Sequence, residues 1–297
     1  MTLQSLLYLI VYVVLFLIVF TAVVWWDRRR RRTRPPFPEN LKLLRMPGQH
    51  LLYQVTHSDE NGFLWLAGAI LAPLLIGTSV LHFLAHFFPS RPALVIILSL
   101  TSFVLLILLA ARFFDKYLQR RDDNYLGFFG ERYVAERLEP LKTHGWSIFH
   151  DIPFAGATGP FNLDHVAVGP GGIWVIETKT RRKGAAKPGR QSHEVKFDGQ
   201  QIIWPAFEET ASLKQALDNA RSLQTWLRDM TGKTFEIASV VAIPGYMVIE
   251  NKLGPVRLAN PMNLPDVLTS RPKSKLSPTD IDLIRRQLES KCRTFEY

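Results

Sequence analysis

Cysteine is almost absent from this chain: Cys292 is the single one among 297 residues. One thiol excludes a disulfide within the chain, and it excludes a zinc site built from several cysteines. Such sparing use of cysteine is typical of proteins in a reducing compartment. The sequence therefore favours a cytoplasmic position for the part of the chain that carries Cys292.

Charged residues are missing from three long apolar stretches, at residues 3–26, 63–88 and 93–112, apart from histidines and the arginine that ends the third stretch. Each stretch is long enough to cross a hydrocarbon core of about 30 Å. No comparable run follows Arg112. We therefore expect three N-terminal transmembrane helices, and a water-soluble domain after them.

Basic residues flank these stretches unevenly. Six arginines follow the first stretch and four basic residues follow the third, whereas Arg91 is the single basic residue between the second and the third. The positive-inside rule then places the N-terminus outside and the loop of residues 27–62 inside. The first stretch lacks a preceding basic residue and is too long for a signal peptide, so we expect a retained anchor. The prediction is a multi-pass protein of a bacterial inner membrane, with a membrane region of residues 1–114 and a cytoplasmic domain of residues 115–297.

The net charge of +10 is concentrated near the membrane region. Residues 1–114 hold ten basic and four acidic residues, a net charge of +6, and residues 115–297 carry +4. Membrane topology and anionic lipid explain most of this excess. The soluble domain is only mildly basic, so its composition alone does not indicate nucleic-acid binding.

Two strands are predicted at residues 162–168 and 173–179, on either side of the turn Gly169-Pro170-Gly171-Gly172. A turn centred between Pro170 and Gly171 makes Asp164 face Glu177. Loops of two and of four residues both give this register, and Pro-Gly favours a type II turn and hence the longer loop. The sequence therefore brings two carboxylates together across a hairpin.

Side chains alternate along a strand, so Lys179 shares a face with Glu177 and Asp164. Facing residues have Cβ atoms about 5 Å apart, and two carboxylates this close repel each other. Lys179 supplies part of the positive charge needed between them, and a divalent cation would supply more. A cross-strand salt bridge without further function is the alternative. We interpret the cluster as a candidate metal site.

The remaining soluble domain reads as helix, strand, hairpin, helix and strand, which predicts an α/β sandwich with a mixed sheet. Glu131 flanks the apolar stripe of the first helix, where it either points toward the sheet or reaches water as a boundary residue. The expected elements are a helix at 122–141 capped by Asp122, Asp123 or Asn124, a strand at 146–152, a loop at 155–160, a hairpin at 193–204, a helix at 208–230, strands at 235–243 and 256–259, and a helix at 279–291.

Several of these segments together resemble a known family. They are Gly130-Glu131-Arg132, Asn162-Leu163-Asp164-His165-Val166, the stretch from Gly171 to Lys179, and Gln215-Ala216. This combination resembles the nuclease-related domain, NERD, which is placed in the PD-(D/E)xK nuclease superfamily. The resemblance covers residues 127–227. Thr180-Arg181-Arg182 departs from the family pattern, which usually has Asn or Pro shortly after the E-x-K.

The resemblance implies a restriction-endonuclease-like fold and hydrolysis of phosphodiester bonds. Asp164, Glu177 and Glu131 would hold Mg²⁺ or Mn²⁺, Lys179 would position or activate water, and Gln215 would orient the site or touch a phosphate. A basic loop follows the motif and is a candidate contact for nucleic acid or, alternatively, a solvated loop. Its basic residues are Arg181, Arg182, Lys183, Lys187 and Arg190.

The resulting hypothesis is a membrane-anchored, Mg²⁺-dependent nuclease whose partners are nucleic acid, with DNA favoured over RNA, and the lipid bilayer. One alternative is a catalytically silent module that tethers nucleic acid or a protein to the inner membrane. Another is a membrane protein whose spans bind partner subunits or further copies of the chain, with the soluble domain as their regulator. The absence of Asp, Glu and Lys within the spans disfavours an ion path.

Overall fold

The structure is a computed structural model that describes residues 3–30, 42–156, 159–270 and 276–295. The chain separates into two compact units, and residues 43–295 form the larger one. The smaller unit contains helix α1 (Leu3–Arg30).

Among the residues that the structure describes, two helices, rather than the three expected, are long and apolar enough to cross a membrane. They are α2 (Gln49–Phe87) and α3 (Pro92–Leu138). Within the described part of α1, the apolar stretch is Val14–Asp27, which is not counted among the candidate spans. The prediction of a third span at residues 3–26 is therefore corrected to two candidate spans.

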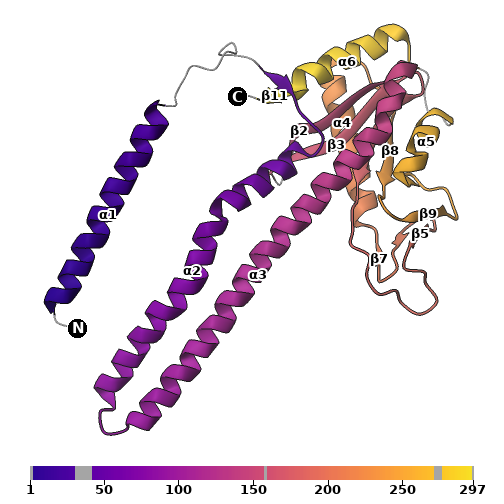
Figure 1. Ribbon diagram of the computed structural model, residues 1–297. Helices are drawn as coiled ribbons and strands as arrows, with labels where there is room; N and C mark the ends of the chain where they lie inside the picture. The colour runs from indigo at the N-terminus through magenta and orange to yellow at the C-terminus, as the bar shows by residue number, and fades with distance from the viewer. Residues whose placement is uncertain (1–2, 31–41, 157–158, 271–275, 296–297) are drawn as a thin grey trace. The chain divides into compact units, whose positions relative to one another are not determined.

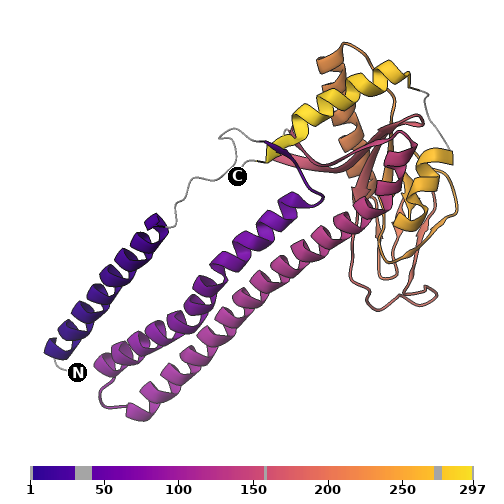
Figure 2. The ribbon, with the colours of Figure 1, turned by 45° about the horizontal axis from the view of Figure 1, so that its top comes forward.

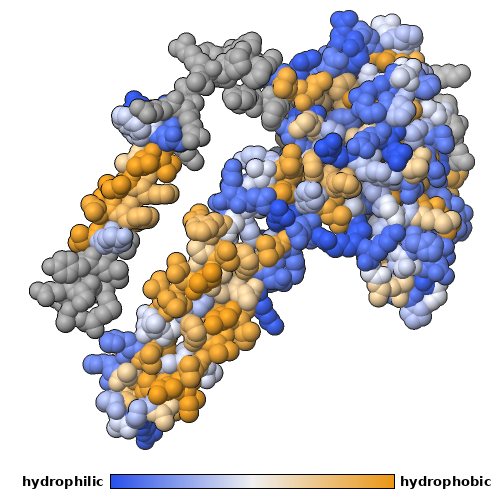
Figure 3. Space-filling model, viewed as in Figure 1, coloured by the Kyte–Doolittle hydropathy of each residue, from blue (hydrophilic) through white to orange (hydrophobic). Residues whose placement is uncertain are grey.

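Helices α2 and α3 lie side by side as an antiparallel hairpin (Figure 1). Small residues allow their close approach: a Cβ added to Gly77 would lie 2.7 Å from a ring carbon of Phe103. Large apolar side chains point away from the pair, for example Leu75 and Ile97, which are 63% and 60% exposed. Figure 3 shows this apolar surface along both helices.

The helix predicted to begin at residue 122 is the last part of α3, which runs without a break from Pro92 and crosses the predicted domain boundary between residues 114 and 115. The expected caps are not used, because this polar stretch stays helical and pairs with α2. Arg121 forms an ion pair with Asp59 of α2, with 2.7 Å between Nε and Oδ1. After Leu138 the chain continues as a 3₁₀ helix, Glu139–His144.

A five-stranded sheet forms the centre of the domain, with the strand order β10-β8-β4-β3-β2. The pairs β2–β3 and β3–β4 are antiparallel, whereas β4–β8 and β8–β10 are parallel, so the sheet is mixed as predicted. The strands are β2 (Ser147–Gly156), β3 (Gly159–Gly169), β4 (Gly172–Thr178), β8 (Ile237–Ala242) and β10 (Arg257–Ala259).

The predicted register of the β3–β4 hairpin is confirmed, because Val168 pairs with Ile173 and His165 pairs with Ile176. The longer loop is wrong: Gly169 pairs with Gly172, which leaves a two-residue connection. Gly172 adopts the positive φ, at 113°, so Gly171 does not take the position that a type II turn requires. The loop expected at residues 155–160 is also wrong, because β2 and β3 remain paired as far as Gly156 and Gly159.

Helices cover both faces of this sheet (Figure 2). One face packs against α4 (Ala211–Thr231) and α6 (Pro278–Cys292), whose buried side chains include Leu223 and Leu288. The other face packs against the end of α3 and against α5 (Leu264–Ser270), through residues such as Val134 and Leu268. The predicted α/β sandwich is thus the observed architecture of this unit.

Two smaller sheets complete the unit. The predicted hairpin at residues 193–204 is present, although the helix expected from residue 208 begins at Ala211. Its sheet has the order β7-β6-β5-β9, with β5 (Glu194–Phe197), β6 (Ile202–Ile203), β7 (Glu208–Glu209) and β9 (Met247–Glu250). The second sheet pairs β1 (Leu43–Leu44) with β11 (Arg293–Phe295). Neither β9 nor the β1–β11 pair was predicted from the sequence.

Candidate functional site

Strands β3 and β4 bring Asp164 and Glu177 to the same end of the sheet. Asp164 Oδ2 accepts a hydrogen bond of 2.6 Å from the backbone N–H of Thr178, the residue after Glu177. Glu177 is 2% exposed, while Asp164 is partly exposed. The apolar residues of the same face, such as Val166 and Val175, are fully buried beneath α4 and α6. The two carboxylates therefore lie where the apolar core ends, as the register predicts.

Lys179 joins this pair to helix α4. Its backbone N–H donates 2.9 Å to the carbonyl of Ala242, which extends the contact between β4 and β8 beyond the last ladder pair. Its Nζ lies 2.8 Å from Glu177 Oε1 and donates 3.0 Å to Gln215 Oε1. The structure thus gathers Asp164, Glu177, Lys179 and Gln215, four of the residues selected from the sequence.

Asn219 belongs to this cluster and was missed by the sequence analysis. Its Nδ2 donates 2.8 Å to Glu177 Oε2, and its side chain is buried. Asn219 lies one turn after Gln215 on α4, which puts the two residues on the same helical face. That spacing is the signal that could have identified it. Lys179 and Asn219 together occupy both oxygens of Glu177.

Glu131 reaches the cluster from α3, and it is 7% exposed rather than a solvated boundary residue. A glycine beside it allows α3 to approach the chain that leaves β4: a Cβ added to Gly130 would lie 1.8 Å from Oγ1 of Thr180. The backbone N–H of Gly48 lies near the Glu131 carboxylate and opposes the rise of its pKa. Residues at the start of α2 therefore also contribute to the site.

A fourth acid, Asp151, was also missed. In the β2–β3 register, His150 pairs with His165 and Ile152 pairs with Leu163, so Asp151 stands at the position that faces Asp164. Its φ of 49° is the one positive value among the non-glycine residues described. Extending the hairpin register to the preceding strand would have revealed this row of acids across three strands.

Burial and mutual repulsion shift the titration of these acids. Burial raises the pKa of Glu131 to about 8, and the negative charges of Asp151 and Glu177 add to the shift. Burial, with the charges of Glu177 and Glu131, also raises the pKa of Asp164. The pKa of Glu177 is raised by burial although Lys179 opposes the change. Lys179 alone therefore does not offset burial and mutual repulsion, which favour the protonated forms of these acids.

The site fits a hard divalent cation by the chemistry of its donors, since carboxylate oxygens are the ligands that Mg²⁺ and Mn²⁺ prefer. The raised pKa values of Glu131, Asp164 and Glu177 also fit a cation, because a bound ion would stabilise their ionised forms. Among the described residues, however, no three His, Cys, Asp or Glu side chains are arranged to ligate an ion together. The ion pair between Lys179 and Glu177 occupies one carboxylate oxygen that a cation would otherwise use.

The basic loop after the cluster is held by protein contacts. Arg181 pairs with Glu209 at 3.0 Å, and its guanidinium lies 5.2 Å from the ring centroid of Trp204. The other four basic residues also have partners: Arg182 contacts Asp123, Lys183 lies over the ring of Tyr246, and Lys187 and Arg190 both contact Glu208. Arg182 is the most exposed of those in ion pairs, at 61%. Its role toward nucleic acid stays a prediction.

His165 lies outside the site, as the alternation of side chains indicates. It is fully buried and its Nδ1 lies 2.8 Å from Nδ1 of His150. Trp174 is 1% exposed and packs in the hydrophobic core with Val134 and Leu268, so it is a packing residue.

The region that contains the cluster also matches a known family. Residues 126–244 match the family model of the nuclease-related domain, NERD. No curated protein and no solved structure matches the chain. The matched residues include Asp164, Glu177, Lys179, Gln215 and Glu131, and they exclude α2 and most of α3. The likeness to the nuclease-related domain is therefore limited to residues 126–244.

Proposed function

We propose that this protein is a membrane-anchored, metal-dependent nuclease that hydrolyses phosphodiester bonds of nucleic acid. The observation that carries the proposal is the cluster of Asp164, Glu177, Lys179 and Gln215, which lies within the part of the chain matched to the nuclease-related domain. Placement in the PD-(D/E)xK superfamily, and DNA as the favoured substrate, are part of this proposal.

The acids would hold the cation, and their neighbours would keep them in position. Asp164 and Glu177, with Glu131 directly or through water, would bind Mg²⁺ or Mn²⁺. When bound, the ion would act as a Lewis acid on the phosphoryl oxygen and lower the pKa of its water. Asn219 would fix one oxygen of Glu177 through the 2.8 Å hydrogen bond.

Lys179 is the residue placed to assist the reaction itself. It is positively charged, because the ion pair with Glu177 and the charge of Asp164 outweigh the effect of burial and raise its pKa. The oxygen of water would form a bond to phosphorus while the bond from phosphorus to the leaving oxygen breaks. The ammonium group of Lys179 would orient that water and stabilise the negative charge on the phosphoryl oxygens. Gln215, which accepts from Lys179, would fix the direction of the ammonium group.

Membrane anchoring rests on α2 and α3. Both helices pass the length and composition test for a span, and their outward side chains are large and apolar. The arginine distribution supports a cytoplasmic position for the nuclease-related domain at a bacterial inner membrane, and two spans return the chain to that side. In this arrangement the site faces cytoplasmic nucleic acid.

One observation favours a second candidate, a catalytically silent binding module. The described residues contain no ready-made group of three metal ligands, and Lys179 already neutralises Glu177. A site without catalytic activity would bind nucleic acid or a protein at the membrane without hydrolysing phosphodiester bonds. The complete set of acids with their lysine favours the enzyme.

Titration of Mn²⁺ into the full-length protein in detergent tests the proposal, with Asp164→Asn for comparison. We expect wild-type protein to bind Mn²⁺ and to cut DNA in Mg²⁺, and the variant to lose both. Glu177→Ala and Lys179→Ala should abolish cutting while the thermal transition is retained. Salt-sensitive DNA binding without cutting, unchanged by Glu177→Ala, would instead support the silent module, and failure to bind Mn²⁺ would refute the metal site.

A further inference from the structure

A short segment from outside the matched domain docks against the site. The entry segment, residues 43–50, includes the first two residues of α2 and is separated by more than 70 residues from the matched region. Its strand β1 pairs with β11, and the backbone N–H of Arg45 donates 3.1 Å to the carbonyl of Cys292. Residues near the C-terminal end of the described chain therefore hold this segment in place.

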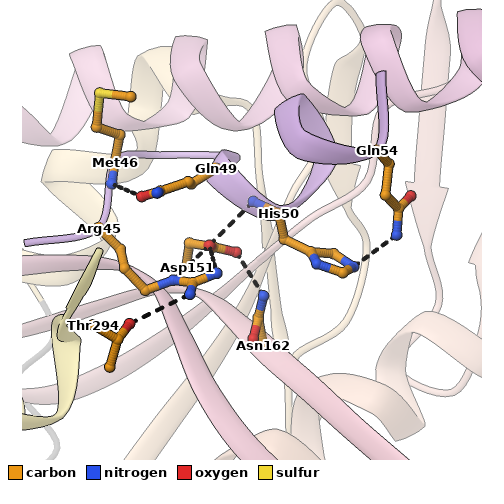
Figure 4. A network of polar contacts seen from close by, with 8 residues as sticks. All are labelled: Arg45, Met46, Gln49, His50, Gln54, Asp151, Asn162 and Thr294. Atoms are coloured by element: carbon orange, nitrogen blue, oxygen red, sulfur yellow. Dashed lines mark hydrogen bonds and ion pairs between the residues drawn. The ribbon is translucent and has the colours of Figure 1, made fainter. Parts of the chain in front are cut away.

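Two residues of the entry segment, Arg45 and His50, contact the buried carboxylate of Asp151 (Figure 4). Arg45 Nε donates 2.8 Å to Oδ2 of Asp151, and Arg45 Nη2 contacts the same oxygen. The backbone N–H of His50 donates to that oxygen too, at 3.2 Å. The other oxygen, Oδ1, accepts 2.8 Å from Nδ2 of Asn162. Asp151 is 3% exposed, so these contacts are shielded from water.

The backbone conformation of Asp151 accompanies its contacts with Arg45 and Asn162. Its positive φ, a conformation that side-chain-bearing residues rarely adopt, interrupts the β2–β3 ladder at the position facing Asp164. The side chain engages Arg45 and Asn162. Asn162 lies two residues before Asp164 on β3 and so belongs to the same face of the strand. One hydrogen-bonded chain thus runs from the entry segment to the strand that carries Asp164.

The same segment makes a direct contact with the acidic cluster. Gly48 lies between Arg45 and His50, and its N–H lies near the carboxylate of Glu131. Only glycine suits this position, because φ is 68° and an added Cβ would lie 2.8 Å from a ring carbon of Phe128. Gly48 also caps α2, and the positive end of a helix stabilises a nearby carboxylate.

We propose that Arg45 and Asp151 are positioning residues, which dock the entry segment so that the Gly48 N–H holds Glu131 at the acidic cluster. The inference rests on the proposed function of that cluster. Because α2 begins at Gln49, the segment that holds Glu131 continues directly into a candidate membrane span. The nuclease-related domain is therefore complete only when the start of α2 is docked.

Hydrogen exchange on the full-length protein in detergent tests the docking without requiring any activity. Arg45→Ala should speed exchange in residues 43–50 and also in residues 126–134, which contain Glu131. Arg45→Lys should give intermediate rates, because an ammonium group replaces the two-pronged contact of the guanidinium. Arg228→Ala, which removes an exposed arginine of α4, is the matched control and should leave both regions unchanged. Faster exchange confined to residues 43–50 would overturn the proposal.

A double-mutant cycle on Mn²⁺ affinity tests whether Arg45 acts through Glu131. We expect Arg45→Ala to weaken Mn²⁺ binding about tenfold or more, as loss of residues that orient metal ligands commonly does. Added to Glu131→Gln, it should cause no further loss. Full additivity would overturn the positioning role. If wild-type protein binds no Mn²⁺, the proposed function fails, and the exchange experiment alone decides the docking.

Discussion

Asn219 and Glu177 are joined by a hydrogen bond of 2.8 Å between Nδ2 and Oε2, within the buried end of the sheet. Replacing Asn219 by alanine would leave a carboxylate oxygen that is shielded from water without its donor. We expect Asn219→Ala to lower the free energy of unfolding by about 1–3 kcal/mol. Urea denaturation measures the loss, and Asp218→Ala, at an exposed position of the same helix, should change little.

Gly130 is required for the contact between α3 and the chain after β4. A methyl group there would collide with Thr180, so Gly130→Ala should destabilise the domain by about 1–3 kcal/mol. Adding Thr180→Ala removes the nearest atom, Oγ1, and should restore part of the loss. Gly184→Ala is the control, because nothing lies within 4 Å of its added Cβ. Equal melting temperatures for all four proteins would contradict this account.

The raised pKa of Glu131 makes stability fall as the pH rises. Burial lifts this pKa from 4.5 to about 8. Between these values the folded protein retains a proton that the unfolded chain has released, so the free energy of unfolding decreases by at most about 1.4 kcal/mol per pH unit. Below pH 4.5 both states are protonated and the effect vanishes.

Glu131→Gln removes this titration and should make the decrease of stability with pH shallower between pH 5 and pH 8, while Asp164 and Glu177 maintain part of the slope. Denaturation midpoints at several pH values in the absence of divalent ions provide the measurement. Glu136→Gln changes an exposed glutamate of the same helix and should retain the wild-type slope. A Glu131→Gln slope identical to wild type would show that the carboxyl group titrates normally.

Arg182 and Arg190 should differ in their effects, although both belong to the basic loop. Arg182 is 61% exposed and makes a weak contact, so Arg182→Ala should weaken nucleic-acid binding and reduce its salt slope by about one. Arg190 donates 2.8 Å to the carbonyl of Trp204 and contacts Glu208. Arg190→Ala should instead lower stability by about 1 kcal/mol. Binding titrations over a range of salt separate the two; an unchanged slope for Arg182→Ala would exclude it as a phosphate contact.

Cysteine labelling tests the proposed orientation in the membrane. Cys292 is buried, so the native background should be low. Ser90→Cys, in the connection between α2 and α3, should react with an impermeant maleimide from outside intact cells. Lys214→Cys, on an exposed position of α4, should react only after permeabilisation. The opposite pattern would invert the topology.

Local patterns in the sequence were sufficient for the central hairpin. Alternating apolar residues and the Pro170-Gly171 turn specify the register that brings Asp164 opposite Glu177, and α4 follows from its apolar stripe. The loop length was wrong because Gly172, rather than Gly171, takes the positive φ. Two adjacent glycines leave that choice to the geometry of the strands.

Residues that depend on distant segments were harder to predict. Asp151 could be recognised only by extending the register to β2, and Arg45 contacts it across more than 100 positions of sequence. The stretch around Asp122 has good helix caps, yet α3 continues through it because Arg121 pairs with α2. Contacts between segments distant in sequence determine these features, and local sequence patterns do not reveal such contacts.

The continuity of α3 has a mechanical consequence. Its 47 residues form a rod about 70 Å long, at 1.5 Å per residue. One end carries Glu131 and packs on the sheet, while the other is the apolar arm of the hairpin with α2. If that arm is embedded in lipid, a change of bilayer thickness that tilts it would swing the opposite end as well. Lipid composition would then change the position of Glu131 relative to the sheet through the tilt of α3.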